Sequence, residues 1–335
     1  MSAGAGAKRV EVAAAVIVRP DGEFLLAQRP AGKVYAGYWE FPGGKIERGE
    51  LARAALQREL REELGIELTH ACPWITREYS YPHAQVRLNF FRVLGWTGEP
   101  HAHEAQALKW LRHDRIDVCP LLPANAPVVR ALALPPVLAI TQASVYGESE
   151  QLDRLNAALG RGLRMVMVRE KQMPRAKLQA FTLEVMRCCA GTGARVLVNG
   201  DIELARACAA HGAHLPSTQL LQCAQRPDLP WCGASCHDER ELEHAAALDL
   251  DYVLLGPLLP TPSHSEAHPL GWERFAQMAR GYPLPVYAVG GMSLQQLAVA
   301  CDAGAQGVAM IRAAWLAAPQ SFPSVWSADS LAPTR

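Results

Sequence analysis

Three glutamates in one short segment have the spacing of a metal site. Glu59, Glu62 and Glu63 stand at positions i, i+3 and i+4, so a helix would place them on one face. Ionised carboxylates that close together repel one another and need a cation, and a cluster of oxygen ligands suits Mg²⁺ or Mn²⁺.

A helix at about residues 51–64 would have to position these carboxylates. Leu56, Leu60 and Leu64 recur every four residues and form the apolar stripe that would bury one side of it. Taken alone, the glutamates and arginines of this helix would also suit a solvated face with Glu–Arg pairs. The sequence around the helix decides between the two interpretations.

A double glycine precedes the helix. Gly43 and Gly44 let the backbone turn tightly and would bring a carbonyl group near the acidic face. We expect Arg58 to point away from that face and to fix the loop through Glu50 or Glu47.

The spacing of this whole segment fits one pattern, G-x5-E-x7-R-E-U-x-E-E-x-G-U, in which U is an apolar residue. The matching residues are Gly44, Glu50, Arg58, Glu59, Leu60, Glu62, Glu63, Gly65 and Ile66. The pattern is the Nudix box, so the first part of the chain resembles the Nudix hydrolases, which cleave nucleoside diphosphates linked to another group. A solvated helix would not require this register, and we therefore reject that interpretation.

Segments outside the box resemble the MutT group of this family, which removes pyrophosphate from oxidised guanine nucleotides such as 8-oxo-dGTP. They are FPGGKIE, GEP and PANAPV, and the resemblance covers about residues 10–132. It implies metal ligation by the Gly43 carbonyl, Glu59, Glu62, Glu63 and Glu104. It also implies that Glu59, Glu104 and Arg58 belong to the catalytic machinery, with Glu104 as a metal ligand or general base.

The same resemblance implies which residues hold the nucleoside of a nucleoside triphosphate substrate. Asn125 matches an asparagine that reads the purine edge, and Arg29 and Phe41 match positions that line the pocket. Asn125 could instead be a turn residue, and Phe41 could belong to the core. Ala84 stands about where the best-known member has a base-contacting arginine, and His83 or Gln85 could take over that role.

The length and composition of the chain predict two domains. We expect a Nudix domain over residues 1–132, with an α+β fold in which a mixed sheet lies between helices. Its first two strands would form a β-hairpin around the turn at residues 19–23. Pro135 and Pro136 disfavour a helix and predict a linker at residues 133–137.

The remainder of the chain alternates short apolar runs with helical segments. The runs are VLAIT, LRMVMVR, RVLVN, AHLP, WCGASC, YVLLGP, PVYAVGG and GVAMI. Eight strands alternating with helices predict an α/β fold, the (β/α)8 TIM barrel, over residues 138–318. The last segment, residues 319–335, is expected to be loosely held.

A barrel of this kind has its active residues at the carboxyl ends of the strands. Those positions hold Arg169, Lys171, Asn199, His214, His237, Thr261, Gly290, Gly291 and Arg312. Two cations near one strand end and a Gly-Gly turn before a helix favour a phosphorylated small molecule as ligand. The candidate acid/base residue is His237.

The order of these segments resembles the thiamine phosphate synthase and thiazole tautomerase family over about residues 137–315. Synthases have an aspartate directly after Asn199, where this chain has Gly200, and a further acid in the loop that here reads HLPSTQL. Those acids hold Mg²⁺ for the pyrophosphate leaving group, so the resemblance favours a tautomerase, in which His237 would shuttle a proton. Two alternatives remain: Nudix hydrolysis of a thiamine-pathway phosphate ester, and a barrel that only binds a ligand and regulates the hydrolase.

The overall composition argues against several classes of function. The formal net charge is zero, so the chain lacks the basic field that binds long nucleic acid. It contains no apolar run of the roughly 20 residues that a membrane helix needs. It also has no CxxC pair, which argues against a structural zinc site. We expect a cytoplasmic protein.

Overall fold

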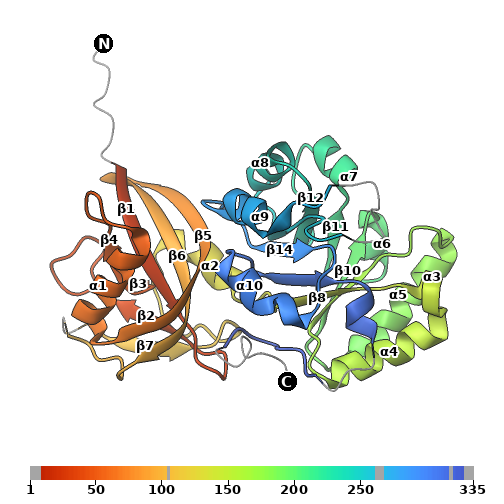
Figure 1. Ribbon diagram of the computed structural model, residues 1–335, viewed down its shortest axis with the longest axis horizontal. Helices are drawn as coiled ribbons and strands as arrows, with labels where there is room; N and C mark the ends of the chain where they lie inside the picture. Colours follow the sequence, from red (N-terminus) through yellow and green to blue (C-terminus); the bar gives the residue numbers. More distant parts are fainter. Residues whose placement is uncertain (1–8, 104–105, 261–267, 317–319, 328–335) are drawn as a thin grey trace, which may run out of the picture. The chain divides into compact units, whose positions relative to one another are not determined.

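The computed structural model describes residues 9–103, 106–260, 268–316 and 320–327. The chain divides into two compact units, and the division falls between Ala133 and Leu134. Each unit has its own sheet system (Figure 1). The expected acid Glu104 and the expected strand-end residue Thr261 lie outside the described residues.

The first unit contains a four-stranded mixed sheet in the order β4-β1-β6-β5. Its strands are β1 (Arg9–Ile17), β4 (Gly43–Lys45), β5 (Glu67–Tyr81) and β6 (Ala84–Thr97). The β1–β6 pair is parallel, whereas β1–β4 and β5–β6 are antiparallel. The prediction of a mixed sheet is therefore confirmed.

A second sheet in this unit has the order β3-β2-β7, with β2 (Phe24–Gln28), β3 (Trp39–Glu40) and β7 (Leu108–Leu111). The predicted hairpin of the first two strands is wrong, because β1 and β2 belong to different sheets. They meet only at one bridge beside the turn, between Val18 and Phe24. Residues Ala13 to Ile17 are all buried, which suits a strand between two partners better than one arm of a hairpin.

The acidic helix α1 (Ala52–Leu64) forms where the apolar spacing predicts it. Leu56, Leu60 and Leu64 are fully buried and pack against β1 and its neighbours. Gly65 ends the helix with a φ of 68°, a left-handed conformation that glycine adopts without strain. A short turn η1 (Pro123–Asn125) and α2 (Ala126–Ala131) close the unit.

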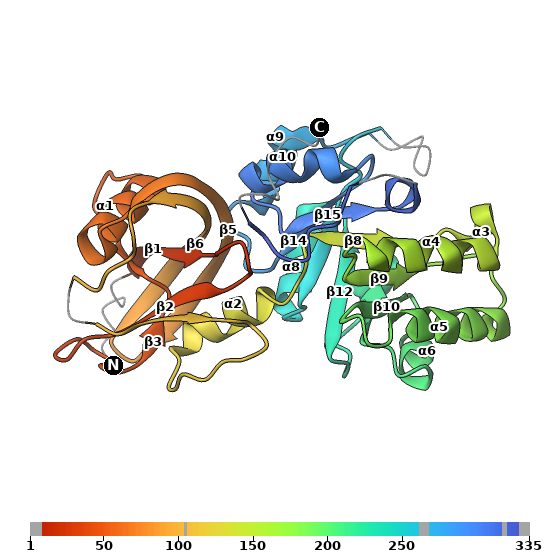
Figure 2. The ribbon, with the colours of Figure 1, turned by 90° about the horizontal axis from the view of Figure 1, so that it is seen from below.

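The second unit is a closed barrel of eight parallel strands, which confirms the predicted fold (Figure 2). The strands are β8 (Val137–Ile140), β9 (Met165–Val168), β10 (Arg195–Asn199), β11 (Gly212–Leu215), β12 (Trp231–Cys236), β13 (Tyr252–Leu255), β14 (Val286–Val289) and β15 (Gly307–Met310). All eight apolar runs in the sequence became strands, because each is short, buried and bounded by turn residues.

Helices alternate with these strands along the chain. They are α3 (Ala143–Tyr146), α4 (Glu148–Gly160), α5 (Arg175–Cys189), α6 (Ile202–Ala207), α7 (Ser217–Gln222), α8 (Glu239–Ala247), α9 (Gly271–Ala279) and α10 (Leu297–Asp302), with the short turns η3 (Leu294–Gln296) and η4 (Arg312–Trp315). In the segment expected to be loosely held, Phe322 is buried and its N–H donates to the Arg161 carbonyl at 2.7 Å.

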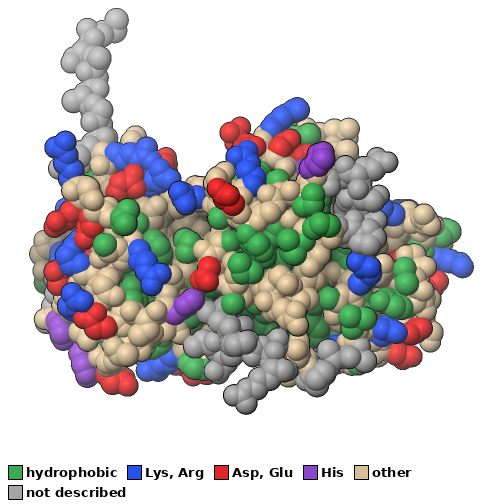
Figure 3. Space-filling view, in the orientation of Figure 1, with side chains coloured by type: hydrophobic (Ala, Val, Ile, Leu, Met, Phe, Trp, Pro, Cys, Tyr) green, Lys and Arg blue, Asp and Glu red, His purple; other side chains and the backbone are tan. Residues whose placement is uncertain are grey.

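Basic and acidic side chains are interspersed on the face shown in Figure 3, as the balanced composition leads one to expect. Among the described residues, every helix is too short or too polar to cross a membrane.

Candidate active sites

The double glycine lies where two other groups come too close for any larger residue. Gly43 has a φ of 143°, and a Cβ atom added there would stand 2.1 Å from the carbonyl oxygen of Ala13. A Cβ on Gly44 would stand 2.1 Å from the carboxyl carbon of Glu59. The carboxylate of Glu59 thus rests directly on the backbone of β4. The backbone requires glycine at position 43, whereas a larger residue at position 44 would displace the Glu59 carboxylate.

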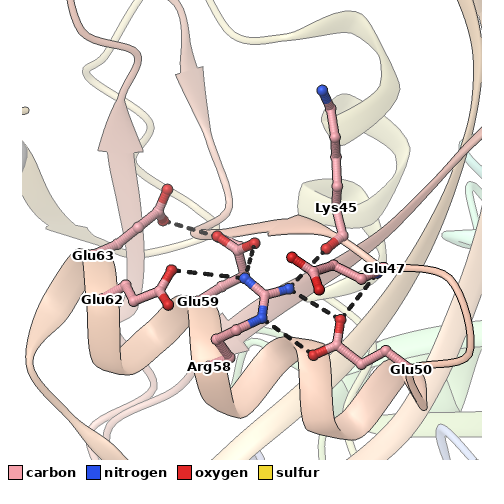
Figure 4. A network of polar contacts seen from close by, with 8 residues as sticks. Lys45, Glu47, Glu50, Arg58, Glu59, Glu62 and Glu63 are labelled. Atoms are coloured by element: carbon pink, nitrogen blue, oxygen red, sulfur yellow. Dashed lines mark hydrogen bonds and ion pairs between the residues drawn. The ribbon is translucent and has the colours of Figure 1, made fainter.

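Arg58 connects the helix to the loop before it and to the acidic face (Figure 4). Its Nε and Nη2 donate to the two carboxylate oxygens of Glu50 at 3.2 and 3.0 Å, and Nη2 also donates to the Lys45 carbonyl. Its Nη1 donates to Glu59 at 2.7 Å and lies 3.6 Å from a carboxylate oxygen of Glu62. The expectation that Arg58 points away from the acidic face is therefore wrong, while the expected link to Glu50 is present.

The ion pair with Arg58 explains the electrostatics of the loop. Hydrogen bonds from Arg58, followed by one from the Glu47 backbone, hold the pKa of Glu50 below its usual range. The same carboxylates raise the pKa of Arg58, so the guanidinium stays charged at any pH of interest. Arg58 therefore offsets part of the repulsion among the glutamates.

The remaining glutamates present oxygen atoms to the space beside Gly43. Glu63 accepts a hydrogen bond from the Gly43 N–H at 3.3 Å, and the side chain of Glu62 is 61% exposed. Carboxylate oxygen atoms are the ligands that Mg²⁺ prefers, so the chemistry of Glu59, Glu62 and Glu63 fits a divalent metal. The oxygen atoms of the three side chains do not all lie within 4.8 Å of one another in the described structure, so a bound metal would have to draw the exposed Glu62 side chain inwards.

Two residues on either side of the undescribed Glu104 hydrogen-bond to the end of α1. The His103 N–H donates to the Glu63 carbonyl at 3.1 Å, and the Gln106 side chain donates to the same carbonyl at 3.3 Å.

The expected nucleoside-binding residues differ in their surroundings. The Arg29 guanidinium donates to the Val34 carbonyl at 2.7 Å and to both carboxylate oxygens of Glu40 at 2.6 and 2.7 Å, so it fastens the β2–β3 connection. Burial raises the pKa of Glu40 despite this partner. Phe41 is buried against the rings of Phe24 and Phe90.

Asn125 is only 2% exposed, its side chain does not cap α2, and its amide atoms are not among the fully buried unpaired polar atoms of the described residues. The amide therefore keeps a small accessible polar surface. Asn125 is therefore a candidate for binding a polar ligand edge, rather than only a turn residue.

A cluster of aromatic rings, which the sequence analysis did not identify, lies beside the segment of Asn125. Tyr35, Tyr81 and His83 have ring centroids 5.3 to 5.9 Å apart. Tyr81 shares a hydrogen bond with the backbone of Ala124, and burial raises its pKa to about 12. The alternating tyrosines of YSY at the end of β5 were the available signal. His83, which belongs to this cluster, immediately precedes Ala84, the position that lacks the arginine expected from the MutT group.

The carboxyl ends of the barrel strands surround a cavity of about 470 Å³. Among its lining residues are Arg169, Asn199, His214, Ser235, His237, Gly290, Gly291 and Arg312. Most of the strand-end residues expected from the sequence therefore meet at one cavity. Lys171 is exposed and does not line it.

The cations at this cavity have few partners of their own. The guanidinium groups of Arg169 and Arg312 make no hydrogen bond or ion pair with the described part of the chain. The Glu170 carboxylate accepts the backbone N–H groups of Ala143 and Ser144 at 2.8 and 3.1 Å, and its charge only partly offsets the effect of burial on Arg169. Burial lowers the pKa of Arg169, and the charge of Arg169 lowers the pKa of Lys171. An anionic ligand would relieve both effects.

Gly290 and Gly291 form a concave backbone turn at the end of β14. Their φ angles are 99° and 72°, and a Cβ at either position would stand 2.8 Å from a neighbouring atom. Their N–H groups donate to no backbone acceptor within the described ranges. Successive free N–H groups of this kind bind anions.

His237 is held by a carboxylate that the sequence analysis did not single out. Glu241 accepts the His237 backbone N–H at 2.6 Å and lies 2.9 Å from its Nδ1 atom. This contact favours the tautomer with the proton on Nδ1 and leaves Nε2 as an acceptor. The i, i+4 spacing of the pair was the available signal.

The acid nearest to the synthase position has another role. Asp201 caps α6 by accepting the Leu204 N–H at 2.8 Å, and it accepts a hydrogen bond from Arg175 at 3.0 Å. Gly200 before it has a φ of 77°.

Comparisons with known proteins identify both units. The description "thiamine monophosphate synthase" matches residues 137–314, and the description "NUDIX domain" matches residues 8–132. The CTP pyrophosphohydrolase of Escherichia coli is 45% identical over 130 residues, which are 37% of this chain and 91% of that protein. The 8-oxo-dGTP diphosphatase of Haemophilus influenzae is 37% identical over 125 residues, which are 37% of this chain and 92% of that protein.

Among solved structures, the thiamine phosphate pyrophosphorylase from Pyrococcus furiosus is 22% identical, with a TM-score of 0.47, and the match covers 54% of this chain and 87% of that one. The chain thus belongs to the Nudix family of hydrolases through its first unit and to the thiamine monophosphate synthase family through its second.

Proposed function

We propose that the first unit is a Mg²⁺-dependent pyrophosphohydrolase that cleaves 8-oxo-dGTP and related oxidised guanine nucleotides to the monophosphate and pyrophosphate. The main support is the Glu59 carboxylate, which rests on Gly44 beside Glu62 and Glu63. When bound, Mg²⁺ would neutralise the pyrophosphate and activate the attacking water. Mn²⁺ could take the same ligands.

The residues of the chain would divide the work as follows. Glu59, Glu62, Glu63 and the Gly43 carbonyl would hold the metal, with Glu104 as a further ligand or general base. Arg58 would keep Glu59 in place and fix the loop through Glu50. Removal of oxidised guanine nucleotides in this way would limit mutation.

The choice of base rests on Asn125. A side-chain amide offers a donor and an acceptor together, which suits the edge of a purine. The small accessible polar surface of this otherwise buried residue supports this role. A site built around such a group rejects ligands that leave it unpaired.

A cytidine triphosphate is a second candidate substrate. The E. coli CTP pyrophosphohydrolase is more similar to this chain than the Haemophilus 8-oxo-dGTP diphosphatase is. Ala84 also lacks the charge that would favour an oxidised base, whereas the neighbouring ring cluster could stack on any base. A thiamine-pathway phosphate ester is the third candidate, because the hydrolase is fused to the barrel.

A panel of substrates tests these candidates. We would compare kcat/KM for 8-oxo-dGTP, dGTP, CTP and thiamine diphosphate with Mg²⁺, in the wild type and in Asn125→Ala and Asn125→Asp. The proposal requires 8-oxo-dGTP to be preferred over dGTP, and both variants to lose most of that preference while they retain turnover. A higher kcat/KM for CTP or for thiamine diphosphate would favour the corresponding alternative.

For the second unit, we propose that the barrel binds a thiazole- or thiamine-type phosphate and that His237 transfers a proton within it. Arg169, Arg312 and the Gly290–Gly291 turn support phosphate binding. Gly200 and the acid-free loop after His214 argue against synthase chemistry, since Asp201 is engaged as a helix cap.

Titration with thiazole phosphate and thiamine phosphate tests the barrel. Conversion of the bound thiazole that is lost in His237→Ala would support a tautomerase. Tight binding that changes the hydrolase rate without any conversion would support a regulatory module instead.

A further inference from the structure

Three polar side chains from neighbouring strands form a chain of hydrogen bonds inside the barrel. The Tyr252 hydroxyl lies 3.1 Å from Nδ1 of His214, and Nε2 of His214 lies 2.8 Å from the Ser235 hydroxyl oxygen. The rings of His214 and Tyr252 are stacked, with an interplanar angle of 25°. His214 and Ser235 also line the cavity at the strand ends.

The burial of this network determines the charge of its central member. Tyr252 and His214 are both 0% exposed. Burial, followed by the charge of Arg169, lowers the pKa of His214 to about 3, so the imidazole is neutral near pH 7. A neutral imidazole has one nitrogen that donates and one that accepts.

Counting protons then fixes the direction of each hydrogen bond. Apart from His214, the Tyr252 hydroxyl has no hydrogen-bond partner in the described part of the chain, so its proton can be satisfied only by donation to Nδ1. His214 must then carry its proton on Nε2 and donate it to Ser235. The reverse direction would place a proton on Nδ1 and leave the fully buried phenol proton without an acceptor, which is unfavourable.

The last hydroxyl in the chain is left with a free proton. Ser235 receives the Nε2 proton on its oxygen, and its own O–H has no acceptor among the described residues. We propose that Tyr252 and His214 position the Ser235 hydroxyl as a hydrogen-bond donor into the barrel cavity, where it binds an oxygen of a phosphate group. This inference rests on the proposed binding of a phosphorylated ligand by the barrel.

The position of this donor suits an anion. Arg169 and Arg312 line the same cavity and have no side-chain partner within the described segments, where the N–H groups of the Gly290–Gly291 turn also lack a backbone acceptor. A hydroxyl held as a donor matches acceptor-only oxygen atoms, as in phosphate, and matches a ligand N–H group poorly. The buried network therefore favours a ligand atom that accepts a hydrogen bond, and it fixes where that atom lies.

The tautomer of His214 tests the network directly. Long-range ¹H–¹⁵N NMR of the full chain, with His214 assigned by substitution, should show the proton on Nε2 and a bare Nδ1. Tyr252→Phe keeps the stacked ring but removes the phenol donor, and it should release His214 into a mixture of tautomers. Tyr287→Phe is the matched control, because its buried hydroxyl donates to the Pro135 carbonyl instead. A proton on Nδ1 in the wild type would overturn the inference.

Binding of inorganic phosphate, measured by calorimetry, tests the consequence. Ser235→Ala and Tyr252→Phe should each weaken binding by roughly threefold to tenfold, the scale of one hydrogen bond, and Tyr287→Phe should not change it. If the wild type binds phosphate and Tyr252→Phe binds it equally well, the positioning role is refuted while the proposed function survives. If the wild type does not bind phosphate, both fail, whatever the tautomer of His214.

Discussion

The carboxyl carbon of Glu59 lies so close to Gly44 that a Cβ atom on the glycine would stand 2.1 Å from it. The glycine is thus required by a side chain that arrives from α1, and not only by the local turn. Strand β4 pairs with β1 at the buried residues Ala13 and Ala14, so the backbone of Gly44 has no space to move away. The position of a metal-binding carboxylate therefore depends on the absence of a single methyl group.

The first prediction is that Gly44→Ala nearly abolishes hydrolysis while the chain still folds. The new methyl group would displace Glu59 from the oxygen cluster, and misplacement by about 1 Å can lower catalysis on the order of 100-fold. The measurement is kcat/KM with Mg²⁺, together with the thermal unfolding midpoint. Gly160→Ala is the control, because its Cβ would meet no atom within 4 Å and its φ lies outside the left-handed region. Full activity in Gly44→Ala would contradict the role given to this contact.

The second prediction concerns Glu62, whose side chain is 61% exposed. Glu62→Gln keeps the volume but removes a charged ligand, so stability should hardly change while the Mg²⁺ concentration needed for half-maximal turnover rises. We expect activity at fixed Mg²⁺ to fall at least tenfold. Substitution of a residue that only hydrogen-bonds to a metal ligand already lowers metal affinity or activity by about 10- to 100-fold. Metal titrations of the wild type and the variant measure this.

The control for Glu62 is Glu67→Gln. Glu67 is also exposed, but its carboxylate is engaged by Arg61 and by the side-chain amide of Gln57. Its loss should leave the metal titration unchanged. An equal shift in both variants would mean that general surface charge, rather than ligation by Glu62, sets the affinity for the metal.

The sequence predicts the barrel well because its signals are local. Each of its strands is a short buried run between turn residues, and the register of a parallel barrel follows from the order of the runs. The helix α1 is predicted for a similar reason, since Leu56, Leu60 and Leu64 mark its buried face. In both cases the spacing of apolar residues along the chain identifies the side chains that are buried in the folded structure.

The failures arise where a residue takes a partner far away in the sequence. The turn after β1 looks like a hairpin, yet β1 pairs with β6, whose partner residues lie 76 positions further along the chain, because burial on both sides outweighs the local turn. The direction of Arg58 could not be read from helical spacing, since Arg58 and Glu59 are adjacent and would be expected to diverge. The network of His214, Ser235 and Tyr252 joins three strands that only the closed barrel makes neighbours.

The third prediction is a dependence of barrel stability on pH. The pKa of His214 is about 3 in the folded state, against about 6.5 for an unfolded histidine. Below pH 6.5 the unfolded chain therefore binds a proton that the folded chain does not. The contribution of His214 is fully present above pH 6.5 and is lost as the pH falls towards 3, by about 2 kcal/mol between pH 6.5 and 5.

Hydrogen exchange of the β11 and β12 amides at pH 7.5 and 5.0, corrected for intrinsic rates, measures this loss. Asparagine at position 214 cannot be protonated in this range. The free energy of opening should therefore change less between the two pH values in His214→Asn than in the wild type, by about 2 kcal/mol. The remaining titratable groups affect both proteins equally. Equal pH dependence in the two proteins would show that His214 is not held neutral.

The fourth prediction concerns Arg169, whose guanidinium lines the barrel cavity without a described partner and whose pKa is lowered by burial. Arg169→Gln removes a half-buried charge whose burial Glu170 offsets only in part, so the unliganded barrel should be as stable as the wild type or more stable. Binding of inorganic phosphate should nevertheless weaken on the order of tenfold or more, because a charge-assisted hydrogen bond is lost. Lys177→Gln on the exposed side of α5 is the control for net charge. A variant that loses stability but keeps phosphate affinity would assign Arg169 to the structure of the barrel rather than to its ligand.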